Sequence, residues 1–566
     1  MNRRLAIALT VLLAACGEAT VVEETPGAIE TEGSGLTTSL LVDEDGLRLA
    51  GASADRSKVL VCKKEEEDGR GSARVVDLVA KKVLMTGPLG AFCGSFDPQP
   101  TFGPGAQRLA GWSFEPSARI WELLTWSAAD PANIFVLARS SGPDLNNEIT
   151  LLVFTPDEER LVYVQPGPVG DGYRLMVHDF ASGQAAQAAA DASLVAPRLS
   201  PDGSRMVFFA DGMGARTVVS YEFATGLATE LGRGHDWTLT PSSDGSRLAF
   251  RTACTDGATG QTACELRDWG FDSQAARLVA TNVESFGGYT PSGDRVAYVS
   301  GGALKVTTLS TSKTFTAAAS ACWARLSPDG TKLAWLATCA ADSKGNASGT
   351  LKLGTLAATS VTGAKTVQSG ALLGTLTTEP AFAPDGKRLL FDRASYTSGF
   401  DLYFYDAASS YSYPRSIVGN DLGAWDGQSG SRVVSPDGKT VVYEKTTTWY
   451  SPYCPWGSCG YRELRSRDIT SSWGSDRSVA GATSLSGSYG GLMASPFAKS
   501  PKGQHLVYLL TNAAGTGKLY AVNTSTSATT QLGSAEGGSP ELSVALGDSF
   551  AALVNGKGLT LLTGLK

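Results

Sequence analysis

The sequence predicts an all-β fold, a β-propeller built from four-stranded blades, and three observations support this. One short phrase, clearest in Leu326–Ala337 (Leu-Ser-Pro-Asp-Gly-Thr-Lys-Leu-Ala-Trp-Leu-Ala), recurs along the 566-residue chain. The copies are separated by about the length of a propeller blade, which is roughly 40–50 residues. The chain also has 65 glycines and little helical periodicity, as expected of many short strands joined by turns.

Each copy predicts a tight turn followed by a strand. In the clearest copy, Pro328 presets φ at the first corner, Asp329 suits the second, and Gly330 accepts the left-handed conformation that follows. This pattern favours a hairpin turn with a bulge. The β-forming residues of 332–336 then predict a buried inner strand. The turn glycines of the regular copies are spaced 37 to 65 residues apart and stand at positions 203, 245, 293, 330, 386, 438 and 503.

This combination of turn, basic residue and apolar-aromatic strand resembles the PD40-type repeat of TolB-like β-propellers. Such repeats also occur in the propeller domains of prolyl-oligopeptidase-like peptidases. The resemblance covers nearly all of the chain after its leader and implies the fold, but propellers serve many functions. TolB itself has a separate N-terminal domain that this chain lacks, so the resemblance does not carry a Tol–Pal role with it.

The repeat predicts about 10–11 blades. Ten units are complete, and an eleventh, starting at Glu541, lacks its outer strand. The segment Thr37–Val42 could supply that strand and close a ring without a free edge. Because propellers usually have four to eight blades, we expect two packed propellers, residues 36–320 and 321–566, with one large ring as the alternative.

The N-terminus resembles a bacterial lipoprotein leader. Arg3 and Arg4 precede a short apolar stretch that ends in Leu-Ala-Ala-Cys16. This pattern predicts a signal peptide over residues 1–15 and lipidation of Cys16, followed by a Pro- and Gly-containing acidic linker over 16–35. Gly17 follows the cysteine in place of an inner-membrane retention signal. We therefore expect an exported outer-membrane lipoprotein, facing the periplasm or the cell surface, that meets the membrane through its anchor only.

Eight of the nine cysteines remain once Cys16 is assigned to lipid, an even number that suits disulfides in an exported protein. Their places in the repeat predict four pairs: Cys62–Cys93, Cys254–Cys264, Cys322–Cys339 and Cys454–Cys459. A zinc site is disfavoured, because the chain has no CxxC pair and only three histidines.

The predicted topology gives the ring two different faces. The turns between strands a and b and between c and d are short and uniform, whereas the loops between strands b and c are long and varied. All eight paired cysteines map to the face that these loops share with the d–a connections. Variable loops on a regular scaffold are usual places for recognition. The richest such loop predicts a binding surface with five aromatic residues, Trp449, Tyr450, Tyr453, Trp456 and Tyr461. Packing of these side chains over the protein's own edge is an equal alternative.

The sequence therefore predicts a non-catalytic, monomeric, lipid-anchored propeller that binds a protein of the cell envelope through its b–c loop face. The alternative is a propeller that binds or cleaves carbohydrate, and a third possibility is a surface spacer. No Gly-x-Ser-x-Gly motif, phosphate loop, metal cluster or cofactor motif is present. The net charge of −7 argues against nucleic acid as a partner.

Overall fold

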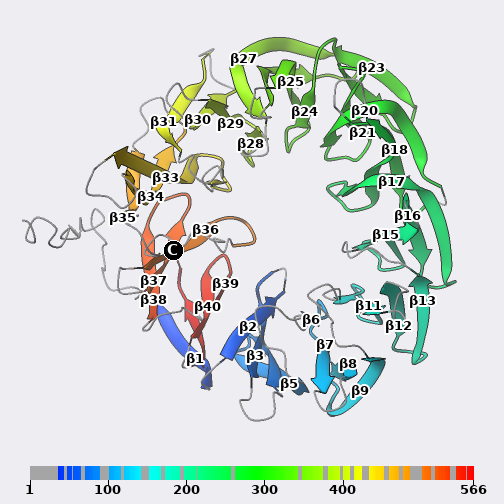
Figure 1. The fold of residues 1–566 in the computed structure, drawn as a ribbon. Coiled ribbons are helices and arrows are strands. Elements are labelled where there is room, and N and C mark those ends of the chain that lie inside the picture. Colours follow the sequence, from blue (N-terminus) through cyan, green and yellow to red (C-terminus); the bar gives the residue numbers. More distant parts are fainter. Residues whose placement is uncertain are drawn as a thin grey trace, which may run out of the picture.

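The computed structural model is a ring of antiparallel β-sheets arranged in sequence order (Figure 1). It describes residues 36–565 except for 44–46, 54, 65–70, 90–100, 116–119, 142–151, 167–172, 191–196, 213–214, 257–261, 274, 342–346, 374–379, 395–399, 408–412, 423–431, 451–457, 471–475, 485–499, 512–516, 536–542 and 556–557. The predicted β-propeller fold is confirmed. The leader, Cys16 and the linker lie outside the described residues.

The described strands form eleven blades, whose strands a to d run outward from the centre. The strands of blades 1 to 3 are β2 (Leu47–Ala52), β3 (Lys58–Lys64), β4 (Gly71–Asp77), β5 (Lys82–Leu89); β6 (Thr101–Phe102), β7 (Arg108–Glu115), β8 (Ile120–Ser127), β9 (Asp130–Ser141); and β10 (Leu152–Phe154), β11 (Arg160–Pro166), β12 (Tyr173–Asp179), β13 (Gln184–Ala189).

Blades 4 to 6 form one continuous ten-stranded sheet, because two long strands each serve as the outer strand of one blade and the inner strand of the next. Their strands are β14 (Arg198–Leu199), β15 (Arg205–Gly212), β16 (Ala215–Glu222), the shared β17 (Leu227–Pro241), β18 (Arg247–Asp256), β19 (Thr262–Gly270), the shared β20 (Arg277–Tyr289), β21 (Arg295–Ser300), β22 (Ala303–Thr308) and β23 (Lys313–Ala318).

The remaining blades complete the circle. Blades 7 to 9 contain β24 (Trp323–Leu326), β25 (Lys332–Ala341), β26 (Ala347–Leu356), β27 (Val361–Leu373); β28 (Ala381–Phe382), β29 (Arg388–Ala394), β30 (Phe400–Asp406), β31 (Arg415–Leu422); and β32 (Arg432–Val434), β33 (Thr440–Tyr450), β34 (Ser458–Asp468), β35 (Asp476–Ser484). Blade 10 contains β36 (His505–Thr511), β37 (Gly517–Asn523) and β38 (Thr529–Ala535). Blade 11 contains β39 (Ser543–Leu546), β40 (Phe550–Asn555) and β41 (Gly558–Thr563), with β1 (Thr37–Asp43) outside them.

Strand β1 closes the ring as the sequence predicts. It pairs antiparallel with β41, from Thr37 opposite Thr563 to Asp43 opposite Gly558, with a register shift between Leu40 and Val42. The first described strand is therefore the outer strand of the last blade (Figure 1). This pairing joins segments more than 500 residues apart, and it covers an edge of β41 that would otherwise expose unpaired backbone groups.

The preference for two packed propellers is wrong, and the single large ring is what the structure has. Each described blade shares a buried apolar cluster with the next one, and blade 11 shares another with blade 1. The division expected near residue 320 falls inside one such cluster, where Val299 and Val306 of blade 6 pack with Trp335 of blade 7. Wedges that each bury both faces against neighbours leave no break at which a second ring could begin.

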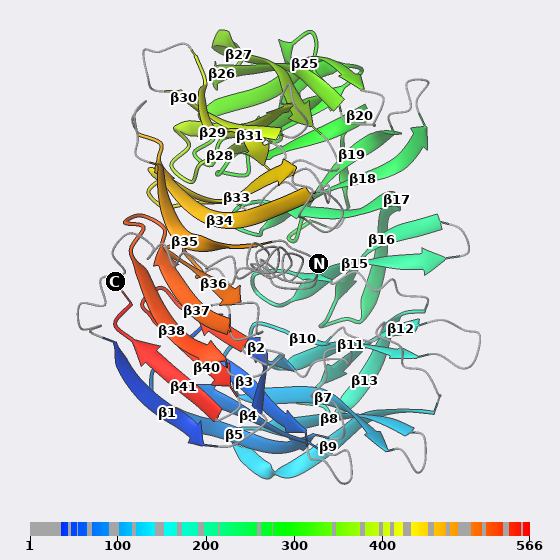
Figure 2. The same cartoon turned by 60° about the vertical axis from the view of Figure 1, so that its left-hand side comes forward.

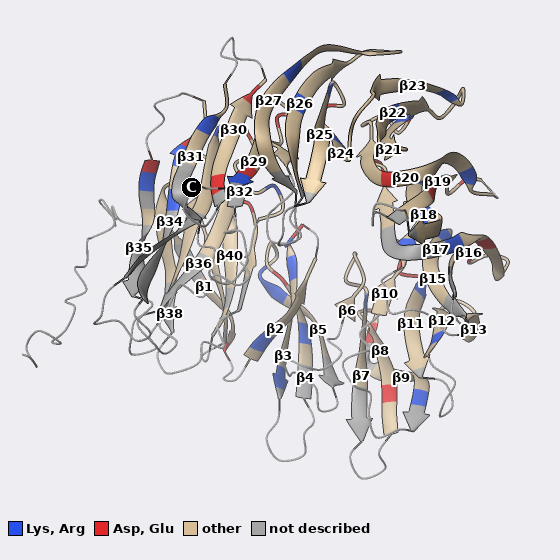
Figure 3. Cartoon of the chain, turned by 45° about the horizontal axis from the view of Figure 1, so that its top comes forward, with Lys and Arg blue, Asp and Glu red and all other residues tan. Residues whose placement is uncertain are grey.

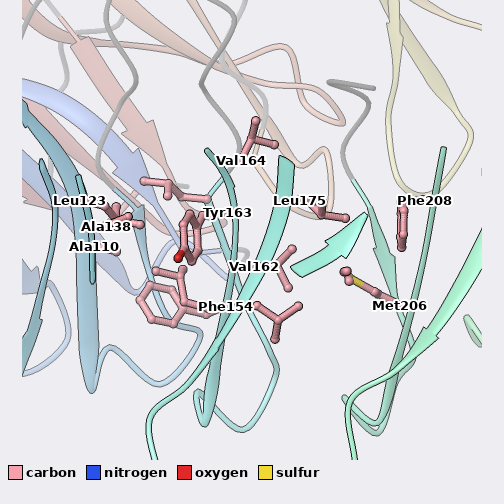
Figure 4. Packing of buried hydrophobic residues seen from close by; sticks show 14 of the residues in the cluster. Ala110, Leu123, Ala138, Phe154, Val162, Tyr163, Val164, Leu175, Met206 and Phe208 are labelled. Atoms are coloured by element: carbon pink, nitrogen blue, oxygen red, sulfur yellow. The ribbon is translucent and has the colours of Figure 1, made fainter. Parts of the chain in front are cut away.

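The core therefore lies between the blades. Between blades 2, 3 and 4, for example, Phe154, Tyr163 and Val162 pack among side chains that include Met206 and Phe208 (Figure 4). All five are at least 95 % buried. Both faces of each middle strand are covered, so its sequence is a nearly continuous apolar run, as the repeat of apolar and aromatic residues indicates.

The recurring turn has the predicted geometry and one feature that the sequence analysis missed. Gly330 donates its backbone N–H to the carbonyl of Ser327 and has a φ of 68°. The Ser327 hydroxyl, which received no role, donates to Asp329 and accepts from the backbone N–H of Lys332 at 2.9 Å. Asp329 in turn accepts from the N–H of Thr331. The phrase thus satisfies its own polar groups while reversing the chain.

Successive turns also touch one another. A Cβ built on Gly330 would stand 2.5 Å from Cδ of Pro291 in the preceding blade, and one on Gly203 would stand 3.0 Å from Cδ of Pro156. A glycine at this place therefore allows the left-handed φ and the close approach of the neighbouring turn. This second constraint belongs to the ring and is invisible within one copy of the phrase.

The basic residue of the phrase links blades. Arg205 donates to the carbonyls of Phe271 and Ser273 in the next blade at 3.0 and 3.1 Å, and Arg295 donates to that of Ala357 at 2.9 Å. In blade 2, Arg108 instead lies over the ring of Phe180 of blade 3, with its guanidinium carbon 3.8 Å from the ring centroid. The recurring cation is therefore part of the contact between neighbouring wedges.

We expect the turns to make the fold acid-sensitive below pH 4. The Ser53 hydroxyl and the N–H of Ser57 lower the pKa of Asp55 from its usual 3.8 to about 2. The pKa of Asp244 is lowered in the same way, chiefly by the Ser242 hydroxyl. Because the folded-state pKa is depressed, this stabilisation is full above the unfolded pKa and is lost as the pH falls through the folded value.

The measurement is the thermal unfolding temperature between pH 5 and pH 2 for wild type, Ser242→Ala and Ser243→Ala. The Ser243 hydroxyl lies in the same turn but donates to the carbonyl of Pro291, so it serves as the matched control. In Ser242→Ala the unfolding temperature should fall less steeply as the pH is lowered. In Ser243→Ala the dependence of the unfolding temperature on pH should equal that of wild type. If the unfolding temperature changes equally with pH in all three proteins, the Ser242 hydroxyl is not what lowers the pKa of Asp244.

Candidate interaction faces

The two faces of the ring differ as the topology requires. The a–b and c–d turns of the described blades lie at one end of the strands, here called the turn face, and the b–c connections lie at the other, here called the loop face. Among the described residues, basic and acidic positions are scattered over many blades (Figure 3).

Blade 9 has the longest b–c arm among the described blades that is paired to its end. Strands β33 and β34 stay in register from Thr440 opposite Asp468 to Tyr450 opposite Ser458. The backbones of three of the predicted binding residues belong to this arm: Trp449 faces Cys459 and Tyr461 faces Thr447. Tyr453, Trp456 and Cys454 lie outside the described residues, so the aromatic surface and the Cys454–Cys459 pair stay predictions.

Two of the four predicted disulfides are confirmed. Cys254 is bonded to Cys264, and Cys322 is bonded to Cys339. Cys62 is also disulfide-bonded, while its expected partner Cys93 lies outside the described residues. The confirmed bridges stand on the loop face, one across the b–c connection of blade 5 and the other between the first two strands of blade 7. They restrain loops that carry no repeat, which is consistent with an exported protein.

A shallow hollow lies on the turn face between blades 2 and 3. Its lining is Gln107, Arg108, Asp157, Glu158, Glu159, Phe180 and Ala181. Its central group, the 95 %-buried Glu158, replaces the turn glycine of blade 3 at a φ of 58°. The carboxylate accepts from the backbone N–H groups of Gly105, Gln107 and Arg108 in blade 2. The lining of the hollow therefore includes a charge-assisted contact between blades.

Charged and titratable groups around that contact have explicable pKa shifts. Burial lowers the pKa of Arg108, which the charge of Glu158 opposes. Burial also lowers the pKa of His178, a residue that packs edge-on against Phe180 with ring centroids 4.9 Å apart. His178 and His505 are both more than 90 % buried. Both histidines thus belong to the packed interior and not to an open site.

Two classes of feature are absent from the described residues. Among the residues that the structure describes, no three His, Cys, Asp or Glu side chains are placed to hold a metal ion together. None of the described segments is a helix long and apolar enough to cross a bilayer.

Comparisons with known proteins assign the chain to no family. No protein-family model and no curated protein matches the chain. Solved structures that resemble it include TolB from Acinetobacter baumannii (15 % identity, 63 % of this chain, 82 % of that chain, TM-score 0.22). They also include the β-propeller domain of the Trilobed protease from Pyrococcus furiosus, whose topology is described as open velcro (11 % identity, 57 % of this chain, 96 % of that chain, TM-score 0.28). A third is dipeptidyl peptidase 4 from Porphyromonas gingivalis (11 % identity, 79 % of this chain, 64 % of that chain, TM-score 0.34). At these scores the fold assignment rests on the strand topology of this chain itself.

Proposed function

We propose that this chain is a lipid-anchored, non-catalytic β-propeller of the bacterial cell envelope that binds an envelope protein through its loop face. The observation that carries the proposal is the β33–β34 arm. An antiparallel arm in register over eleven residue pairs is a stiff projection. Trp449, Tyr450 and Tyr461 belong to its last four pairs, and Tyr453 and Trp456 stand in the sequence between its two strands. Large aromatic side chains on a preorganised support are the usual anchors of protein interfaces.

The confirmed disulfides support the same face and compartment. Both bridges restrain the loop face, whereas the turn face is held by repeated hydrogen bonds within and between turns. An interface on the loop face would therefore be formed from parts that differ between blades, and such differences are what discriminate one partner from another. Disulfides persist in oxidising compartments, which supports export.

The test is photo-crosslinking in intact cells from a reactive amino acid at position 456 or, as the matched control, at the exposed Ala224 on the turn face. A discrete protein adduct from position 456 alone is the expected result, and Trp449→Ala should abolish it. Glycan-array binding that is lost in Trp449→Ala/Trp456→Ala, without a protein adduct, would favour the carbohydrate alternative. Adducts that are equal from both positions would overturn a specific loop-face interface. Mass spectrometry of the mature N-terminus separately tests lipidation of Cys16.

A further inference from the structure

The outer strands of blades 11, 1 and 2 carry an unusual set of exposed apolar side chains. On β9, the consecutive residues Ile134, Phe135 and Val136 are 39 %, 55 % and 44 % exposed. In blade 1, Val79 in the c–d turn is 75 % exposed and Val83 on β5 is 40 % exposed. Leu40 on β1 is 53 % exposed. We call these six residues the apolar rim.

The apolar rim lies at one level of the ring. Ile134 pairs with Trp126 and Val83 pairs with Val76, each close to the c–d turn of its blade. Leu40 lies three residues from the start of β1, which is at the same end of its blade. Strands β5 and β9 contact each other, and Lys81 of blade 1 donates to the Ser39 hydroxyl of β1 at 3.3 Å. Strands β1, β5 and β9 follow one another along the outside of the ring in both views (Figures 1 and 2).

Among the described residues, the other outer strands do not repeat the pattern, although Tyr413 before β31 is 80 % exposed. The exposed positions of β13 are filled by Gln184, Ala185, Ala186 and Gln187. Blades 4 and 5 each expose one leucine at the corresponding place, Leu227 at 60 % and Leu278 at 46 %. Isolated exposed apolar residues are ordinary, whereas a contiguous group on the unpaired side of edge strands needs a cover.

The place where the N-terminal segment joins the ring indicates what binds the apolar rim. Leu36, the first described residue, packs against the core between blades 10 and 11, and β1 begins at Thr37 at the turn-face end of blade 11. The chain from Cys16 therefore meets the ring beside Leu40 and Lys81. Nineteen residues lie between Cys16 and Leu36, so the chain from one to the other can span at most about 70 Å when fully extended. A lipid on Cys16 would therefore hold the turn-face end of blade 11 within that distance of the bilayer surface.

We propose that the apolar rim docks on the lipid bilayer that holds the anchor, with Phe135 and the valines in the headgroup–acyl boundary. The exposed Lys81 and Lys82 among the valines suit phosphate headgroups. This second membrane contact rests on the lipid anchor of the proposed function and gives the ring an orientation. The turn-face edge of blades 11, 1 and 2 lies against the membrane, and the loop face points away from it, toward a partner.

The experiment removes the lipid so that the rim is measured alone. The full mature polypeptide from residue 17, exported with a signal that has no lipobox, is floated with vesicles of phosphatidylethanolamine and phosphatidylglycerol at about 3:1. Val79→Ser/Phe135→Ser is compared with the matched control Leu227→Ser/Leu278→Ser, which changes residues of similar exposure on blades 4 and 5. We expect wild type and control to float with the vesicles, and the rim variant to lose about fivefold or more of its binding.

Three results would overturn the rim proposal. Wild type that does not float, or an equal loss in both variants, would mean that the rim has no specific affinity for lipid. Sedimentation of wild type as a dimer that Val79→Ser/Phe135→Ser converts to a monomer would identify a second copy of the chain as the cover. The anchor is tested separately. If mass spectrometry finds Cys16 without lipid, the lipid anchor of the proposed function is wrong, and the vesicle experiment still decides whether the rim binds lipid.

Discussion

Val42→Asp is expected to open the ring at its closing blade and to cost on the order of 4 kcal/mol of the free energy of unfolding of that blade. Val42 on β1 is 93 % buried and packs in the cluster shared by blades 11 and 1, with Val59, Val61 and Val554 among its members. A carboxylate there would lose its hydration, and the described part of this cluster is apolar. The strand that would be released is the one that joins the two ends of the chain.

The measurement is hydrogen exchange at the amides of β1 and β41. Because a loss of about 4 kcal/mol corresponds to a factor of roughly a thousand, Val42→Asp should lower the protection of these amides from exchange by that factor. Leu40→Asp is the matched control: it makes the same kind of change two residues earlier on the same strand, at a side chain that is 53 % exposed. Its protection should change less than about threefold. Similar losses in both variants would mean that β1 does not close the ring through its buried side.

Gly330→Ala is expected to destabilise the contact between blades 6 and 7 by about 2–5 kcal/mol, from two separable causes. The left-handed φ of 68° costs an alanine about 1–2 kcal/mol. The added methyl group would also stand 2.5 Å from Cδ of Pro291, and the ring of a proline held in a turn cannot rotate away, so overpacking adds about 1–3 kcal/mol.

Gly363→Ala separates these causes. Gly363 has a φ of 61°, and a Cβ built on it has no neighbour within 4 Å. It should therefore show the backbone cost alone, as a smaller fall in the thermal unfolding temperature than Gly330→Ala produces. If the two substitutions lower that temperature equally, the close packing of successive turns contributes nothing to the stability of the ring.

The features that could be predicted from the sequence are those that one copy of the phrase specifies locally. Pro328, Asp329 and Gly330 are sufficient to indicate the turn, and the apolar run after them indicates the strand. The pairing of Thr37–Val42 with the last blade followed from counting strands, because a blade with three strands leaves an edge. The pairs Cys254–Cys264 and Cys322–Cys339 followed from their places in the repeat.

The features that could not be predicted depend on contacts between copies. The number of rings is set by the angle between neighbouring wedges, and this angle depends on how side chains such as Val306 and Trp335 pack across the interface. The sequence does not give this angle, so the prediction relied on the usual number of blades in propellers, which favoured two packed rings over one. The roles of the Ser327 hydroxyl and of Glu158 were missed for related reasons. The serine was treated as a generic turn residue, and Glu158 binds backbone groups of another blade.

The apolar rim was equally hidden. Alternating or continuous apolar runs predict that a strand is buried, and Ile134–Val136 fits that pattern as well as a middle strand does. Its exposure follows from its place as the outermost strand of its blade. A long apolar stretch at the position of strand d is the signal that could have identified the rim in the sequence.

The central claim, that the chain forms one closed ring of eleven wedges, is tested most directly by electron microscopy of the purified protein. Face-on class averages should show a single ring with eleven spokes and an open centre. Particles that resolve into two smaller discs of five or six spokes would contradict the account.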